Sequence, residues 1–375
     1  MSDTIAGAHR PYRVIQWGVG YIGCYALKYI LDNPDLELVG IKCHTQEKVG
    51  KTASELCGIG DCSVKATNDA DALLALEADC VIYMPRDTFV DPSLTLSEPW
   101  FLDLVQLLRS GKNVVTSLTA GTHYRQMKHG ERFRQALEDA CREGNSTVFF
   151  SGFDPGFSDL LAVTMSGAVG GVSKIETWEM VDYGDYPILD TLRAMGFGQR
   201  PEAVQGNPLE FVGVTWGGVP YLMAESLGVE LDGIAVEGDV YLAPESFVAK
   251  GGLEIEKGTV GALRFSVSGL VDGKPRFVVQ HVTRIGQDMA PDWPSIGRDG
   301  GYRVIIDSYP SFQGDFPMGL PGGTGTTLSD AMCMTSGRCV AVVPDIVRAS
   351  VGYVTFLQLP PIRGARTRGL LAPAP

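Results

Sequence analysis

The sequence is short of positive charge and of long apolar runs. It has 31 lysines and arginines against 44 aspartates and glutamates, which leaves a formal net charge of −13. This charge would repel the phosphate backbone of nucleic acids and an anionic membrane surface. No stretch approaches the ~18 consecutive apolar residues that span a bilayer, and residues 1–10 lack the apolar middle of a signal peptide. We therefore expect a cytoplasmic protein with no nucleic-acid or membrane partner.

Sequence patterns of a metal site are absent as well. The eight cysteines include no C-x-x-C pair, and the five histidines are isolated in sequence. Structural zinc sites usually combine such pairs at short spacings. In a chain of this length the cysteines are interpreted as buried, reduced thiols, and no metal is predicted.

Glycine is abundant, at 46 of 375 residues, and one group of glycines has an informative spacing. The β-rich run at residues 12–17 leads into "GVGYIG" at residues 18–23, and residues 24–31 then have the apolar spacing of a helix. In such a loop the first glycine makes the turn, the second lets the backbone approach a pyrophosphate, and the third lets the helix pack on the strand. A purely structural turn is the alternative. The predicted dinucleotide contacts are Gly18, Gly20, Tyr21, Ile22 and Gly23.

The expected order of helices and strands indicates an α/β fold with two domains. Strands and helices alternate along residues 1–157, which is typical of a doubly wound, parallel Rossmann sheet. Residues 158–325 are expected to form a second α+β domain that is mainly antiparallel, with few helices among its strands. These strands are expected at residues 174–181, 228–236, 260–270 and 275–283. Helical spacing returns after residue 326, so we expect segment 326–375 to pack back on the first domain.

The end of the second expected strand bears on which dinucleotide is bound. An NAD site usually places an Asp or Glu there, about 20 residues after the glycines, to bind the ribose hydroxyls. Residues 41–45 read "IKCHT" and contain no carboxylate. His44, Thr45 and Lys48 could instead bind a 2′-phosphate. The sequence thus favours NADP(H), with NAD(H) possible; a merely solvated loop is the alternative.

A rigid turn follows the last Rossmann strand and holds the first candidate acid. The turn "SGFDPGF" at residues 151–157 should lie at the carboxyl edge of the sheet, where open α/β sheets bind ligands. We predict that Asp154 is catalytic and that Gly156 and Phe157 contact the cofactor. Thr116 and Ser117, at the end of a neighbouring strand, are predicted cofactor contacts too. Alternatively, Asp154 only caps the next helix.

Three further residues are candidates for proton transfer or substrate contact. His281 lies in an expected strand of the second domain, where a structural, hydrogen-bonded histidine is the alternative. Tyr183 follows another strand and could supply a phenolic donor, although ordinary loop aromatics are common there. Glu98 precedes a proline at a helix start, where its charge suits the helix dipole, and it is the fallback acid.

Several segments together resemble a known family. They are "VIQWGVGYIGCYALKYILDNPDLELVGIKCHTQEKVGKTASELCG", "GKNVVTS", "SGFDPGFSDLL" and "RCVAVVPDIVRASVGYVTFLQLP". The chain resembles the NAD(P)H-dependent amine dehydrogenases and 2,4-diaminopentanoate dehydrogenases, many of which are labelled dihydrodipicolinate reductase-like. The resemblance implies a Rossmann domain, a substrate and dimerisation domain, and a substrate cleft between them. It also implies a homodimer, which agrees with the sheet edges expected in the second domain.

The chain departs from the family pattern at two places. The His-His pair with a nearby Lys that marks true dihydrodipicolinate reductases is absent, which argues against lysine-pathway chemistry. Amine-forming members carry a glutamate after the strand that matches residues 113–117, whereas here the segment reads Leu118-Thr119-Ala120-Gly121-Thr122. This difference argues against amine formation from free ammonia but leaves hydride transfer intact.

The resulting hypothesis is an NAD(P)H-dependent oxidoreductase that transfers a hydride to or from a C=N or C=O carbon. A small, largely apolar substrate is expected, because aromatic residues accompany the candidate site. A non-catalytic NADP(H)-binding sensor is the alternative from another class. A dihydrodipicolinate reductase-like or sugar dehydrogenase-like enzyme is a further alternative, although the Glu-Lys-Pro motif that the sugar dehydrogenases carry is missing.

Overall fold

The computed structural model describes residues 10–85, 95–118, 124–127, 130–204, 207–297, 300–320 and 325–371. Its larger sheet has seven parallel strands in the order β15-β6-β5-β4-β1-β2-β3. The strands are β1 (Tyr12–Trp17), β2 (Leu36–Lys42), β3 (Ala66–Thr67), β4 (Cys80–Tyr83), β5 (Asn113–Thr116), β6 (Thr147–Phe150) and β15 (Gly352–Val354). The predicted α/β class with a doubly wound parallel sheet is therefore confirmed.

Helices cover both faces of this sheet. They are α1 (Tyr21–Asp32), α2 (Ala53–Cys57), α3 (Ala70–Leu74), α4 (Pro99–Arg109), α5 (Gly130–Gly144), α11 (Thr327–Ala341) and α12 (Val343–Arg348). Apolar residues of α1, α11 and α12 pack on one face, and those of α3, α4 and α5 pack on the other. Because both faces are covered, strands such as β4 are buried along their whole length.

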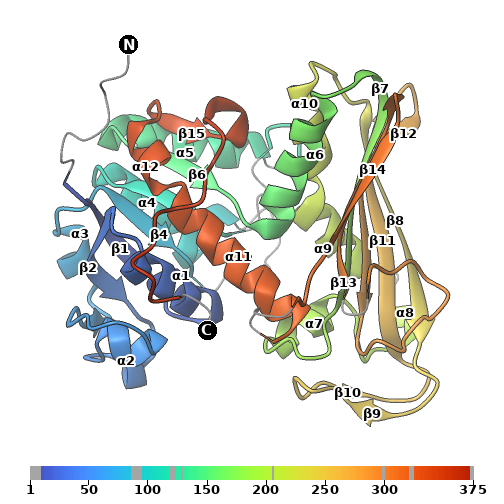
Figure 1. The fold of residues 1–375 in the computed structure, drawn as a ribbon, viewed down its shortest axis with the longest axis horizontal. Helices are drawn as coiled ribbons and strands as arrows, with labels where there is room; N and C mark the ends of the chain where they lie inside the picture. The colour runs from blue at the N-terminus through green and yellow to red at the C-terminus, as the bar shows by residue number, and fades with distance from the viewer. Residues whose placement is uncertain are drawn as a thin grey trace.

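The C-terminal segment returns to the first sheet. Helix α11 packs along α1, and β15 pairs with β6 at the sheet edge. Figure 1 shows the orange helix α11 beside the blue helix α1, and the red β15 at the edge of the first sheet near α5. The division of the chain at residues 157 and 325 stays a prediction.

The second sheet has six strands in the order β14-β13-β7-β12-β11-β8. Neighbours are antiparallel except β7 and β12, which run parallel. The strands are β7 (Gly170–Asp182), β8 (Gly233–Leu242), β11 (Val260–Val271), β12 (Lys274–Arg284), β13 (Gly300–Tyr309) and β14 (Phe312–Pro317). A small hairpin, β9 (Phe247–Val248) with β10 (Glu254–Ile255), lies beside it. The expected mainly antiparallel sheet is present, although β8 begins five residues later than residue 228.

The expectation of few helices between these strands is wrong. Four helices lie between β7 and β8, namely α7 (Leu189–Ala194), α8 (Pro201–Val204), α9 (Asn207–Trp216) and α10 (Gly218–Ser226), and α6 (Ser158–Ser166) precedes β7. Glycines and prolines split residues 196–220 into pieces too short to show helical spacing. These helices are stabilised instead by tertiary packing, for example by burial of Val212, Val219 and Met223 in the hydrophobic core beside the second sheet. Helices α6, α9 and α10 pack on one face of the second sheet and lie between the two sheets in Figure 1.

None of the helices in the described part of the chain is both long and apolar enough to cross a bilayer.

Candidate active site

The glycine loop after β1 has the shape of a pyrophosphate cradle. Gly18 has a φ of +93°, and a Cβ there would lie 2.1 Å from the carbonyl oxygen of Met84. A Cβ on Gly23 would lie 2.1 Å from the carbonyl oxygen of Gly18, so the helix needs glycine for close packing. Gly20, in contrast, faces open space, and α1 begins directly after it with no side-chain cap. Free N–H groups at a helix start suit a phosphate, so the loop fits a dinucleotide.

The two other predicted residues of this loop have different surroundings. Tyr21 is 46% exposed and its ring meets Tyr25 edge-on. The carbonyl oxygen of Ile22 accepts a hydrogen bond of 2.8 Å from Ser336 Oγ on α11. The returning helix therefore braces the start of the helix that would hold the phosphates.

The residues predicted to bind a 2′-phosphate do not all point outward. His44 and Thr45 follow β2 and are exposed. Lys48 is half-buried, and its Nζ donates a hydrogen bond of 2.5 Å to the carbonyl oxygen of Val19 in the glycine loop. Lys48 therefore supports the loop directly, and a contact with a 2′-phosphate stays a prediction.

A carboxylate that the sequence analysis did not identify lies beside the residues that follow β2. Asp103 on α4 lies close enough to His44 and Lys42 for their charges to interact. Burial raises the pKa of Asp103, and the two neighbouring bases only partly oppose the shift. Asp103 lies on a helix about 60 residues after β2 in sequence, whereas the NAD pattern places its acid at the end of that strand. The sequence pattern therefore does not indicate Asp103.

The predicted contacts at the end of β5 join this strand to the candidate catalytic turn. Thr116 is fully buried, its Oγ1 accepts from the Leu118 amide at 3.2 Å, and its carbonyl oxygen accepts from the Ser151 amide at 2.9 Å. Ser117 follows it and is half-buried. Of residues 118–122, which replace the family's glutamate, Leu118 is buried and residues 119–122 lie outside the described residues.

Asp154 points away from the helix that follows its turn. Its Oδ1 accepts a hydrogen bond of 3.0 Å from Trp216 Nε1 on α9, and its Oδ2 lies 3.5 Å from His281 Nε2. The carboxylate is 5% exposed. The N-cap residue of α6 is Phe157, with no side-chain cap, and it is Asp159 whose Oδ2 accepts from the Gly156 amide of the turn at 2.9 Å. The cap interpretation of Asp154 is therefore wrong.

The returning helix α11 holds the turn in place. Thr335 Oγ1 accepts from the Phe153 amide at 3.1 Å, and Arg338 Nε donates to Ser151 Oγ at 2.7 Å. Phe157, 36% exposed, stacks on Phe153 with ring centroids 5.3 Å apart. The predicted cofactor contacts Gly156 and Phe157 thus belong to a braced turn, with the Phe157 ring partly open to solvent.

A row of four side chains crosses the second sheet opposite Asp154. Tyr302 on β13 pairs with Glu179 on β7, Glu179 pairs with His281 on β12, and His281 pairs with Phe265 on β11. Residues in register on neighbouring strands lie on one face and contact each other. Here the His281 ring stacks on Phe265 with centroids 4.5 Å apart.

Glu179 is the centre of this row. Its Oε1 accepts from Tyr183 Oη at 2.7 Å, and its Oε2 accepts from Tyr302 Oη at 2.5 Å. Its Oε1 also lies 3.5 Å from His281 Nδ1. The His281 ring therefore stands between two carboxylates, Glu179 on its Nδ1 side and Asp154 on its Nε2 side.

Burial and mutual charge shift the pKa values of this cluster in opposite directions. Burial, together with the charge of Glu179, raises the pKa of Asp154 to about 6, although His281 and Trp216 oppose the rise. Burial also acts to raise the pKa of Glu179, but His281 and the two tyrosine hydroxyls outweigh it, so that pKa is lowered. For His281, burial acts to lower the pKa and the two carboxylates reverse this, so its pKa is raised. The two carboxylates therefore favour the protonated form of the imidazole that lies between them.

The same three residues could be considered as metal ligands. Asp154, Glu179 and His281 offer ligand atoms within 4.8 Å of one another. However, each carboxylate faces a different nitrogen of the imidazole ring, so the histidine separates the two acids as a proton relay would. This geometry favours acid–base chemistry, and the expectation of no metal stays a prediction.

The structure brings three of the four predicted catalytic residues together: Asp154, Tyr183 and His281. The fourth, Glu98, is the N-cap residue of α4 on the first sheet. Sequence reasoning missed Glu179 and Tyr302. A carboxylate inside the apolar run of β7 was a usable signal for Glu179, whereas Tyr302 had none.

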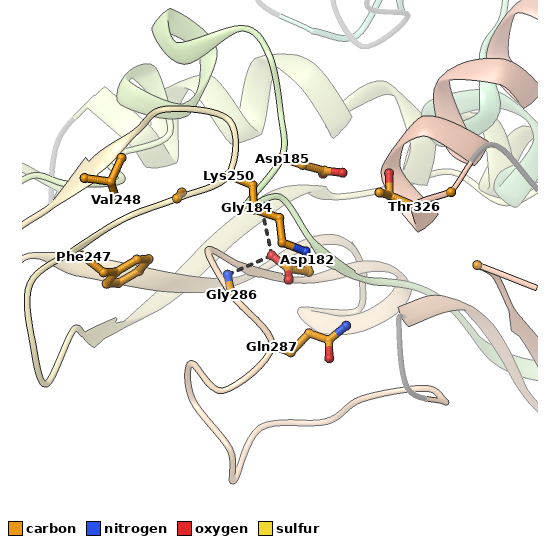
Figure 2. A pocket seen from close by; sticks show the side chains of 12 residues that line it. Asp182, Gly184, Asp185, Phe247, Val248, Lys250, Gly286, Gln287 and Thr326 are labelled. Carbon is orange, nitrogen blue, oxygen red and sulfur yellow. Dashed lines mark hydrogen bonds between the residues drawn. The ribbon is translucent and has the colours of Figure 1, made fainter.

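A separate polar pocket lies where the parallel strands β7 and β12 end. It has a volume of about 290 Å³. Figure 2 shows Asp182 at its centre, where Oδ1 accepts from the amides of Gly184 at 2.7 Å and Gly286 at 2.8 Å. Lys250 and Asp185 also line it. This lining is more polar than the apolar substrate expected from the sequence would require.

Comparisons with known proteins place the chain in a family. No family model matches it. A curated amine dehydrogenase from Streptomyces virginiae is 32% identical over 352 residues, which cover 92% of this chain and 95% of that protein.

Two solved structures share the fold. Amine dehydrogenase from Mycobacterium smegmatis has a TM-score of 0.72 at 17% identity and covers 95% of this chain and 98% of its own. A probable dehydrogenase from Thermotoga maritima has a TM-score of 0.56 at 13% identity and covers 92% of both chains. Since the curated relative matches almost end to end and the glycine loop fits a dinucleotide, the chain belongs to the amine dehydrogenase family and is an NAD(P)-dependent oxidoreductase.

Proposed function

We propose that this enzyme interconverts a small amine and its C=N form, with NADP(H) as the preferred cofactor and Asp154 as the acidic group at the reacting nitrogen. The observation that carries the proposal is the buried contact between Asp154, from the carboxyl edge of the Rossmann sheet, and His281, from the second sheet. The family of the chain supports the same class of substrate.

The cofactor would lie along the carboxyl edge of the first sheet. Gly18, Gly20 and Gly23 would hold the pyrophosphate at the start of α1, and Thr116 lies at the end of β5 on the same edge. When bound, the nicotinamide supplies or accepts the hydride. The protein contributes position, charge and exclusion of water.

Asp154 suits an iminium or ammonium group of the substrate. A carboxylate favours the positive charge that makes a C=N carbon electrophilic, so it lowers the barrier to hydride addition. Trp216 fixes one oxygen of Asp154 and His281 faces the other, so the carboxylate has a defined orientation. In the amine-to-imine direction the same carboxylate, with a pKa near 6, can accept a proton from the ammonium group.

The side chains around Asp154 favour a substrate with a small apolar body. Trp216, Phe153 and Phe265 surround the charged cluster, and Trp216 lies edge-on to His281 with ring centroids 4.5 Å apart. Aromatic walls contribute burial of apolar surface without a further polar requirement. The charged cluster would then supply the only strong electrostatic recognition.

The preference for NADP(H) rests on the corner after β2. His44 and Thr45 are exposed there, no carboxylate follows the strand directly, and Lys48 lies within the same loop. Asp103, whose pKa is raised, is the nearby group that would disfavour a 2′-phosphate if it were ionised. We propose that the two exposed side chains outweigh it.

A substrate panel tests the function. The purified enzyme is incubated with NADPH and with ketones, cyclic imines, or ketones plus ammonium, and cofactor oxidation is followed by absorbance. We expect turnover of cyclic imines above that of the matching ketones. Turnover of ketones alone would show an alcohol dehydrogenase-type reaction, and no turnover with any member would contradict the proposal.

A further inference from the structure

Glu179 has a set of contacts that the reaction proposed above does not yet use. It is buried on β7, and both of its oxygens accept hydrogen bonds from tyrosine hydroxyls. Two hydroxyl donors favour the ionised form of a carboxylate. The next group along the row is His281, which meets Glu179 through Nδ1 only.

The surroundings of His281 make it dependent on this carboxylate. The ring is 1% exposed and lies between the aromatic side chains of Phe265 and Trp216. Burial between aromatic rings disfavours an imidazolium ion. The groups that oppose this are Asp154 on the Nε2 side and Glu179 on the Nδ1 side.

Other charged groups near the cluster do not replace Glu179. Asp159 on α6 is fully buried behind the turn, where burial and the charge of Asp154 raise its pKa. Arg338 on α11 lies on the same side and donates to Ser151. Tyr183 and Tyr302 contact Glu179 itself. Glu179 is therefore the anion in direct contact with the Nδ1 edge of His281.

We propose that Glu179 is a positioning residue that keeps a proton on both nitrogens of His281. The His281 imidazolium then neutralises one of the two carboxylate charges, and Asp154 keeps an anionic oxygen for a cationic substrate. The proposal rests on the function proposed above. With Asp154 and Glu179 ionised and His281 protonated, the cluster carries one net negative charge. This net charge favours an iminium or ammonium substrate over a neutral carbonyl of the same shape.

Replacing Glu179 by glutamine removes the charge and nearly preserves the shape. His281 would lose its Nδ1-side anion and become neutral, and Asp154 would then lose the cation 3.5 Å away. The loss of the His281 charge raises the pKa of Asp154, and the loss of the weaker Glu179 charge opposes only part of this rise. A reaction that needs ionised Asp154 would therefore lose activity at higher pH than in the wild type. We expect the acidic limb of kcat/KM to move up by about one pH unit or more.

The first measurement reads His281 directly. Nitrogen chemical shifts of the histidine side chains are recorded at pH 7.5, with His281→Gln used for assignment. We expect both His281 nitrogens to be protonated in the wild type and one to be deprotonated in Glu179→Gln. The matched control is Glu176→Gln on the same strand, because Glu176 faces the opposite side and pairs with Lys174 and Trp178. The control should leave the His281 signals unchanged.

The second measurement reads the reaction. The substrate is an N-methylated cyclic iminium ion, whose charge does not titrate, and kcat/KM with NADPH is measured from pH 5 to 9 for the wild type, Glu179→Gln and Glu176→Gln. The upward move of the acidic limb is expected in Glu179→Gln only.

The outcomes distinguish a failure of the role of Glu179 from a failure of the proposed function. A neutral His281 in the wild type overturns the role of Glu179 even if Glu179→Gln does not fold. A protonated His281 with an unmoved limb in Glu179→Gln overturns it as well. If the wild type turns over no imine at all while His281 is protonated, the proposed function fails and the effect of Glu179 on His281 stands.

Discussion

The charge of Asp154 can be removed with little change in shape by Asp154→Asn. Two opposite unit charges about 4 Å apart attract by about 4 kcal/mol at an effective dielectric constant of about 20. His281, 3.5 Å from the same carboxylate, already offsets part of this attraction. We therefore expect the loss of about 1.4 to 2.8 kcal/mol of transition-state stabilisation, which is about a tenfold to hundredfold lower kcat for cyclic imines.

Cofactor affinity should be nearly unchanged in this variant, because the glycine loop belongs to another part of the first sheet. The assay combines steady-state rates on a cyclic imine with a fluorescence titration of NADPH. Full activity of Asp154→Asn would refute the reasoning, and Tyr183, His281 and Glu98 would be tested next as the acid. A simultaneous loss of NADPH binding would show that the turn holds the cofactor and does not act on the substrate.

Four further predictions concern the cofactor loop, the cofactor, pH and assembly. Gly18→Ala should weaken NADPH binding and lower the free energy of unfolding by at least about 1 kcal/mol, because φ is positive there and the new Cβ would meet the Met84 carbonyl. The control for thermal unfolding is Gly50→Ala, where φ is also positive but the space around the new Cβ is open. kcat/KM should be higher with NADPH than with NADH, and a tenfold preference for NADH would show that the corner after β2 is misread. Since the pKa of Asp154 is raised to about 6 and the reaction needs its ionised form, activity on a permanently charged iminium should fall as pH drops through about 6; a flat profile from pH 5 to 7 would exclude this carboxylate. Sedimentation should give about twice the chain mass of 40.3 kDa, whereas a monomer at micromolar concentration would contradict the expected homodimer.

The first sheet could be predicted from the sequence because its signals are local. A strand, a glycine loop and a helix follow one another within about 30 residues, as in one βαβ unit. Each glycine of the loop has a separate steric reason, which the structure shows at Gly18 and Gly23. The family resemblance is confirmed by the curated amine dehydrogenase.

The candidate site was only partly predictable because its contacts join distant segments. Asp154 and His281 were each selected for their chemistry, but nothing in the sequence shows that they lie 3.5 Å apart. Glu179 meets His281 only because β7 and β12 pair in parallel, and that pairing depends on tertiary packing. Tyr302 is added by a third strand, more than 120 residues after Glu179.

The most direct test of the central claim is a crystal structure of the complex with NADP⁺ and a small primary amine that the enzyme oxidises. We expect the amine nitrogen to lie within about 3 Å of an Asp154 carboxylate oxygen, with its carbon facing the nicotinamide ring. An amine bound elsewhere, with Asp154 still enclosed by Trp216 and His281, would contradict the claim.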